Sequence, residues 1–452
     1  MRIPQFIRDL LPLCGILGIS LIYLQKVITY GYERELSGGM IKFAGLAYAD
    51  WGVLCMLGSG ALLHREMKPQ LKRPLVIAVV LLTGMAVIIG FPQALTRTMM
   101  VNDVRITLSF ICGLCFAVSL RHSRLWHWHL VLLLVCLVVL MLKAYRDATF
   151  GESFVVGLSG GARLATINSV ASLSTASLVL VALLITFGSL RSRWILPNAF
   201  GLYMPVFYMA VVSSGTRSAL IYVVAALGGA LFVRAYGHRE RGLDRWPSIA
   251  RLAGLGAIAC VFSGLFIYRY RSFLHEQALL FLSRFKGEGM ADESTSLRVL
   301  EIQALFGDLN PFGWVVGRGV GGVFPSPIYD GGLAPTLHVG IFTLLLKFGL
   351  PVFLVVCGIL YCYLPYRFCK AVVLPARNTK QRRESIMLVF PCMLPMIGGL
   401  SLSGGYGTGA MLWWGLLYGC YVFLEKDGLA PYLQWGHRGG GVQRSHVYGP
   451  RR

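Results

Sequence analysis

The sequence predicts an all-α polytopic membrane protein with about twelve transmembrane helices and a large helical loop on the outer face. Hydrophobic residues make up 56% of the 452 positions, and charged residues only 14%. The mean hydropathy is +0.65, which is well above that of soluble globular domains. Apolar runs of about 20 residues, the length that crosses a bilayer core, recur along the chain between short polar segments.

Each predicted transmembrane helix is one of these apolar runs. The runs cover residues 9–25, 45–63, 74–93, 104–120, 125–143, 165–189, 194–213, 218–236, 250–268, 338–365, 385–403 and 408–425. They divide the chain into a first set of spans in residues 1–268, a long loop at 269–337, a second set of spans at 338–425 and a basic tail at 426–452. The tail is rich in Gly and Arg, and we expect it to be disordered.

The charge pattern orients these spans in the membrane. Lys and Arg concentrate in short segments such as 64–73, 234–245 and 367–383. Because cytoplasmic loops carry an excess of these residues, we expect both termini in the cytoplasm and the 269–337 loop in the periplasm of a bacterial inner membrane. Anionic lipid headgroups then account for the net charge of +22, and no nucleic acid partner is needed.

The 269–337 loop carries apolar and aromatic residues throughout, so we expect it to be folded. Residues 272–285 have Leu and Phe at helical spacing, with Arg284 among them, as in an amphipathic helix on a membrane surface. A second helix is predicted at 292–308, where an acidic start suits a helix N-terminus. Gly and Pro then break the chain through residues 310–327.

The cysteines and acidic residues give no sign of a metal or cofactor site. The eleven cysteines lie in or beside apolar runs, and the Cys112 and Cys115 pair is best interpreted as two buried thiols. The outward acids contain no DxD motif, so we expect neither metal nor cofactor. Gly317, Gly319 and Gly322 match GxGxxG, but no βαβ unit surrounds them, which excludes dinucleotide binding.

A basic residue at the outer end of a span is the first candidate for chemistry. Arg217 lies in the segment SSGTRSALI, beside Ser214 and Thr216. Small hydrogen-bonding residues before a helix suit an anion cradle, although an arginine that anchors the span among headgroups is the alternative.

Two arginines of the 269–337 loop are further candidates. Arg298 lies on the predicted second loop helix, and a surface ion pair with Glu301 three residues later is the alternative to a ligand-binding role. Arg318 is flanked by Gly317 and Gly319, so the backbone there allows close approach of a ligand, with a simple turn as the alternative.

His338 begins the tenth predicted span at the membrane interface. Histidine accepts a proton near neutral pH, as attack by a sugar hydroxyl requires, although a histidine that only binds water is the alternative. Arginines that converge beside the membrane match the charge and geometry of a diphosphate. The combination therefore predicts binding of a charged leaving group together with activation of an acceptor.

The order of these segments resembles the bacterial O-antigen ligase and O-antigen polymerase superfamily. The resemblance covers Arg217 in its Ser/Thr-rich segment, DESTSLR ending at Arg298, NPFGWVVGRG, and His338 followed by GIFTLLLKFGLPVFL. It implies a glycosyltransferase that takes a glycan from undecaprenyl diphosphate at the periplasmic face, without metal. Arg217 and Arg298 would hold the diphosphate, and His338 would activate the acceptor.

The resemblance leaves the acceptor open. Ligases of this superfamily transfer the glycan to the lipid A core oligosaccharide, polymerases to another lipid-linked repeat, and related members to proteins. Ligase is our first hypothesis. Many relatives have Asn after the histidine, whereas this chain has Val339, so the subfamily stays undecided. A transporter or flippase is less favoured, because the spans show few midplane charges, and a membrane scaffold is a third class.

Overall fold

A computed structural model describes a large part of the chain and shows a mostly helical protein. The described residues are 3–29, 42–92, 97–150, 154–156, 162–164, 167–183, 228, 261, 265, 268, 290–327, 332–373, 380–402 and 406–427. The predicted runs at 194–213 and 218–236, the run at 250–268 and the helix at 272–285 lie outside them, apart from isolated positions. Every other predicted run coincides with a described helix or with part of one.

The described helices fall into two groups along the sequence. The first group consists of α1 (Gln5–Thr29), α2 (Tyr48–Leu62), α3 (His64–Leu71), α4 (Pro74–Gly90), α5 (Arg97–His122), α6 (Trp126–Phe150) and α7 (Ile167–Leu183). The second group consists of α12 (Met290–Asp308), α13 (Pro311–Val316), α14 (Gly340–Cys357), the π-helical turn η3 (Gly358–Tyr363), α15 (Leu364–Val373), α16 (Lys380–Leu402) and α17 (Thr408–Asp427).

The described residues also contain short antiparallel strand pairs that the all-α prediction did not include. The pairs are β1 (Lys42–Phe43) with β2 (Leu46–Ala47), β3 (Phe154–Val156) with β4 (Ala162–Leu164), and β5 (Phe324–Pro325) with β6 (Leu333–Ala334). Their strands are only two or three residues long, so hydrophobic alternation cannot reveal them. The β5 and β6 pair matters for the site because it lies between α13 and α14 and pairs the segment that follows α13 with the segment that precedes α14.

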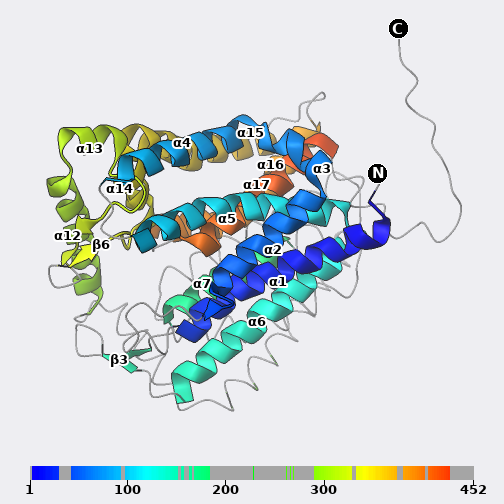
Figure 1. The fold of residues 1–452 in the computed structure, drawn as a ribbon, viewed down its shortest axis with the longest axis horizontal. Helices are drawn as coiled ribbons and strands as arrows, with labels where there is room; N and C mark the ends of the chain where they lie inside the picture. The colour runs from blue at the N-terminus through cyan, green and yellow to red at the C-terminus, as the bar shows by residue number, and fades with distance from the viewer. Residues whose placement is uncertain are drawn as a thin grey trace, which may run out of the picture.

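Helix α5 forms the centre of the described bundle, and most of its apolar stretch is buried. It packs side by side with α17, as Figure 1 shows. Glycines allow this approach, because a Cβ on Gly113 would overlap the Leu412 carbonyl oxygen and a Cβ on Gly415 would overlap that of Phe110. Small residues at such contacts let backbones meet, which is how helices associate where the surroundings are as apolar as their side chains. Cys112 and Cys115 lie in this core as buried free thiols, which confirms their predicted burial.

Several described helices have the length and composition of membrane spans. The segments Gln5–Gln25, Met99–His122, Trp126–Ala144 and Gly340–Ala371 are each long and apolar enough to cross a membrane. Helices α3 and α4 make a fifth if they count as one span, although they are bent by 77°. Large apolar side chains such as Leu81, Ile88 and Val355 are exposed on these helices, as expected of surfaces that face lipid.

The elements of the 269–337 loop lie together at one end of the bundle. Figure 1 shows α12, α13 and β6 at one end and the N-terminus of α1 at the other. Helix α12 confirms the predicted second loop helix, but the predicted Gly and Pro break contains the short helix α13. Asn310 caps it by accepting a hydrogen bond from the Gly313 amide at 2.6 Å, and Pro311 is its first residue. Asn followed by Pro is a recognised helix start, so the predicted break was wrong at a point where the sequence itself indicates a helix.

Candidate functional site

The predicted site residues are only partly within the described residues. Arg298, Arg318 and His338 are described, whereas Arg217, Ser214, Thr216 and Arg284 lie outside. The described part of the site consists of α12, the β5 and β6 pair, and the start of α14.

His338 is held by Glu301 through two contacts. The Glu301 Oε2 atom accepts the backbone N–H of His338 at 2.9 Å, and Oε1 lies 3.1 Å from His338 Nδ1. Glu301 is fully buried, while 45% of the His338 side chain is exposed. One carboxylate thus fixes both the backbone and the ring of a histidine whose outer edge stays accessible.

The surrounding apolar contacts explain why Glu301 meets His338. Leu305, one turn after Glu301 on α12, is buried in a cluster with Leu337, Leu345 and Leu346, which flank His338 in sequence. The cluster also contains Phe324 and Ala334, which pair across β5 and β6. The strand pair and the cluster together bring the residues before α14 against the inner face of α12.

Hydrogen bonds then fix the turn into α14. The Leu337 amide donates to Thr343 Oγ1 at 3.0 Å, and the Ser326 hydroxyl donates to Glu301 Oε1 at 3.3 Å. Glu301 therefore faces three donors, which are the His338 amide, the His338 ring and Ser326. A carboxylate at Glu301 accepts at every one of these positions.

This arrangement defines the chemistry open to His338. A carboxylate only accepts, so the Nδ1 atom that faces it carries the ring proton, and Nε2 keeps a lone pair. A partner that fixes the tautomer and orientation of a histidine is the arrangement that general bases use. His338 can therefore accept a proton at Nε2 from a hydroxyl group that approaches its exposed edge.

Arg298 lies on the same helix as Glu301, three residues earlier and therefore on the same side of α12. Its side chain is half-buried. Glu301, the alternative ion-pair partner of Arg298, is not a surface residue, because it is fully buried and its oxygens bind His338 and Ser326. Arg298 stands one helical turn from the His338 and Glu301 pair.

Arg318 binds groups of the protein itself. Its guanidinium donates to the Val323 carbonyl at 2.7 Å and to the Asp308 carbonyl at 2.8 Å. Asp308 Oδ2 also lies 2.8 Å from Nη2, close enough for an ion pair but without hydrogen-bond geometry. These contacts join the end of α12 to residues 317–323, which we call the glycine loop.

The glycine loop is inserted at a break in α14. Gly349 has φ of 79°, outside the helical region, and Pro351 has no N–H to donate to the Lys347 carbonyl one turn earlier. The freed carbonyls of Leu346 and Lys347 accept instead from the amides of Arg318 at 2.7 Å and Gly319 at 3.1 Å. The break in α14 and the loop thus satisfy one another's backbone groups, as buried polar groups require.

A buried ion pair anchors the far side of the glycine loop. Lys347 Nζ lies 2.6 Å from Asp103 Oδ2 of α5 and donates to the Gly322 carbonyl at 2.7 Å. The same Asp103 oxygen accepts the Gly321 amide at 2.7 Å. Both side chains are almost fully buried. The pair therefore connects α5, α14 and the loop through charge-assisted hydrogen bonds.

Sequence reasoning missed Glu301, Ser326 and the Asp103 and Lys347 pair as parts of this site. Glu301 carried a readable signal, because it lies midway between Leu297 and Leu305 at four-residue spacing on the apolar face of α12. The pairing of Asp103 with Lys347 spans 244 positions, and no local pattern encodes it. Among the described residues, no group of three or more His, Cys, Asp or Glu side chains is arranged to hold a metal ion.

Comparisons with protein-family models, with curated proteins and with solved structures find no match for this chain.

Proposed function

We propose that the chain is a membrane glycosyltransferase that moves a glycan from undecaprenyl diphosphate to an acceptor hydroxyl, with the lipid A core oligosaccharide as the first choice of acceptor. The observation that carries this proposal is the pairing of His338 with the buried Glu301. The pairing supplies an oriented proton acceptor at the end of a span, one helical turn from Arg298.

The proposed reaction is a single displacement at the anomeric carbon of the donor sugar. The acceptor oxygen forms a bond to this carbon while its proton passes to Nε2 of His338. The bond between the anomeric carbon and the diphosphate oxygen breaks, and its electron pair leaves with the diphosphate. The developing negative charge is stabilised by guanidinium groups, Arg298 and, by the resemblance, Arg217.

Glu301 acts here as a positioning residue, since it holds the ring of His338 and touches no substrate. Its carboxylate also offsets the positive charge that the imidazole gains with the acceptor proton. Loss of a positioned general base typically slows a reaction by about 10²- to 10⁴-fold. His338→Ala should therefore abolish measurable transfer while the protein still inserts into the membrane.

The test uses membranes that contain the full chain, lipid-linked glycan and lipid A core acceptor. Transfer is followed by lipopolysaccharide gel electrophoresis. The amount of the protein in the membrane and its thermal unfolding in detergent are measured in parallel. The wild-type chain should give core bearing long glycan, whereas His338→Ala should leave the glycan on its lipid. Undiminished transfer by His338→Ala would refute the proposed base.

A deletion strain separates ligase from polymerase activity within this class. A strain that accumulates unattached lipid-linked polymer identifies a ligase, because polymerisation continues without the final transfer. A strain whose core carries one repeat identifies an O-antigen or exopolysaccharide polymerase.

A transporter or flippase is the second candidate, and the buried Asp103 and Lys347 pair is the observation that favours it. Ionisable residues inside membrane proteins often mark pathways for ions or substrates. Both groups, however, are bonded to the backbone of the glycine loop, which suits a fixed anchor. Translocation of lipid-linked glycan by vesicles that hold the purified chain, with no acceptor present, would favour transport over transfer.

A further inference from the structure

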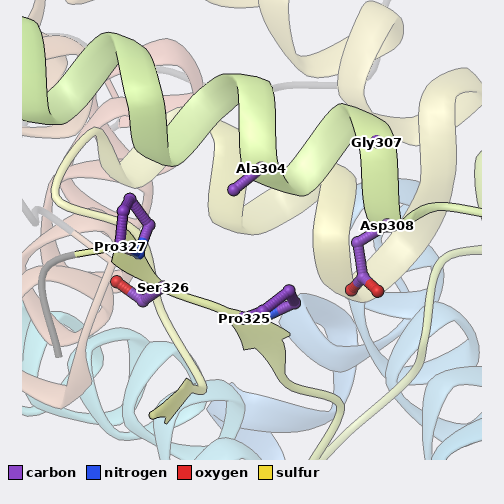
Figure 2. A pocket seen from close by; sticks show the side chains of 6 residues that line it. All are labelled: Ala304, Gly307, Asp308, Pro325, Ser326 and Pro327. Atoms are coloured by element: carbon purple, nitrogen blue, oxygen red, sulfur yellow. The ribbon is translucent and has the colours of Figure 1, made fainter. Parts of the chain in front are cut away.

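An open groove lies beside the His338 and Glu301 pair, between α12 and the segment that contains β5. Its volume is about 400 Å³, within the range of about 300–1,000 Å³ that small-molecule sites occupy. Figure 2 shows the lining side chains of α12 facing those of the strand segment across the opening. The lining residues are Ala304, Gly307, Asp308, Pro325, Ser326 and Pro327.

The groove is connected to the proposed base through a short chain of contacts. Ser326 lines the groove, and its hydroxyl donates to Glu301 Oε1 at 3.3 Å. The same Glu301 oxygen lies 3.1 Å from Nδ1 of His338. Ala304 follows Glu301 by three residues on α12, so the groove begins one turn from the carboxylate that orients His338.

The lining has the chemistry that recognises a sugar ring. The two proline rings and the Ala304 methyl group offer apolar surface to the C–H face of a pyranose, and the described lining includes no bulky side chain that would fill the space. A carboxylate at one edge, that of Asp308, can accept hydrogen bonds from ring hydroxyls. Arg318 Nη2 lies 2.8 Å from this carboxylate and holds it in place.

We propose that this groove binds an uncharged sugar ring of the glycan substrate next to the reacting centre. This inference rests on the proposed function and names a subsite of the same site. The described lining residues include no cation, and their one charged side chain, Asp308, is already paired with Arg318, so an acidic sugar or a phosphate would find no positive group to pair with in the groove. The groove therefore takes a neutral ring, and the diphosphate is left to Arg298 and, by the resemblance, Arg217.

The test fills the groove without disturbing its walls. Gly307 lies on the surface of α12, and a Cβ at this position would meet no atom within 4 Å, so we expect the fold to tolerate Gly307→Leu. Gln303→Leu is the matched control, because this residue is exposed on the same helix and does not line the groove. Both variants place the same side chain on α12.

The first measurement is steady-state transfer by the full chain. Gly307→Leu should raise KM by about tenfold, a loss of about 1.4 kcal/mol in binding, with kcat changed little. A rise in the KM of the acceptor assigns the groove to the acceptor sugar, and a rise in that of the donor assigns it to the donor sugar. If Gly307→Leu leaves both KM values unchanged and Gln303→Leu also behaves like wild type, the groove is not a sugar subsite, and the glycosyltransferase proposal stays intact.

The second measurement does not depend on turnover. Saturation-transfer NMR on the detergent-solubilised chain uses the methyl glycosides of glucose, galactose, mannose and glucuronic acid. Wild type and Gln303→Leu should saturate at least one neutral glycoside about tenfold more than Gly307→Leu does, and glucuronoside should bind more weakly than the neutral sugars. Equal signals from all three proteins, or preference for the glucuronoside, would refute the subsite even if no transfer activity were found.

Discussion

The carboxylate of Glu301 and the imidazole of His338 form a buried-to-exposed pair, in which a fully enclosed acid orients a ring that is 45% exposed. The acid comes from α12 and the ring from the segment that starts α14. The pair therefore forms only when α12 packs against the start of α14.

We expect Glu301→Gln to lower kcat by about 10²-fold with a small change in KM. The amide has one accepting oxygen, which can face either the His338 ring and Ser326 or the His338 backbone N–H, so its NH₂ group meets a donor at the other position and the hold on His338 is weakened. Rates of glycan transfer at saturating substrate measure the effect. Glu66→Gln at the Arg8 ion pair is the control and should keep the wild-type kcat.

Arg318→Lys tests whether this arginine holds structure or substrate. The lysine keeps the charge but loses the fork that reaches the carbonyls of Asp308 and Val323 together. We expect thermal unfolding to show a loss of about 1–3 kcal/mol, with little change in the KM of the donor. A large rise in that KM at unchanged stability would instead return Arg318 to the substrate-binding role that the sequence predicted.

Lys347→Met should destabilise the protein by about 3–5 kcal/mol, because it leaves the carboxylate of Asp103 buried without its partner. The midpoint of thermal unfolding in detergent measures this loss. The double change Asp103→Asn with Lys347→Met should recover much of it, since no uncompensated charge remains. Lys370→Met, at an exposed position on α15, is the control. An Lys347→Met protein as stable as wild type would show that the pair is not an anchor.

Gly319→Ala should displace the glycine loop. Gly319 has φ of 73°, which disfavours a side chain, and a Cβ there would overlap the Gly90 amide and the Ala86 carbonyl of α4. We expect a lower unfolding midpoint and faster proteolysis within residues 317–323. Gly307→Ala, where a Cβ meets no neighbour, should leave both unchanged or slightly improved. Similar behaviour of the two variants would contradict the tight insertion of the loop.

The sequence was sufficient for features that depend on local composition. Apolar runs predicted helices such as α5 and α6, because a run of this length has no other way to satisfy its backbone in lipid. The acidic start at Asp292 predicted α12, and the apolar surroundings of Cys112 predicted its burial. These features depend only on residues that are neighbours in the chain.

Features that depend on distant partners escaped prediction. The sequence suggested a surface ion pair for Glu301, since nothing local reveals that Leu337 and Leu345 cover that side of α12. The glycines of residues 317–323 predict only a break, whereas the amides of Arg318 and Gly319 bond to carbonyls of α14 that the break at Gly349 leaves free. Arg217 remains a prediction, because it lies outside the described residues.

The partnership of Asp103 and Lys347 also bears on how the protein is made. The ribosome completes α5 long before it reaches Lys347, which lies 244 positions later. During that interval the carboxylate has no ammonium to neutralise it, and a lone charge is costly in hydrocarbon. Helix α5 is therefore expected to reach its final depth only after α14 has been inserted. The centre of the bundle is then completed only when the C-terminal helices have been made.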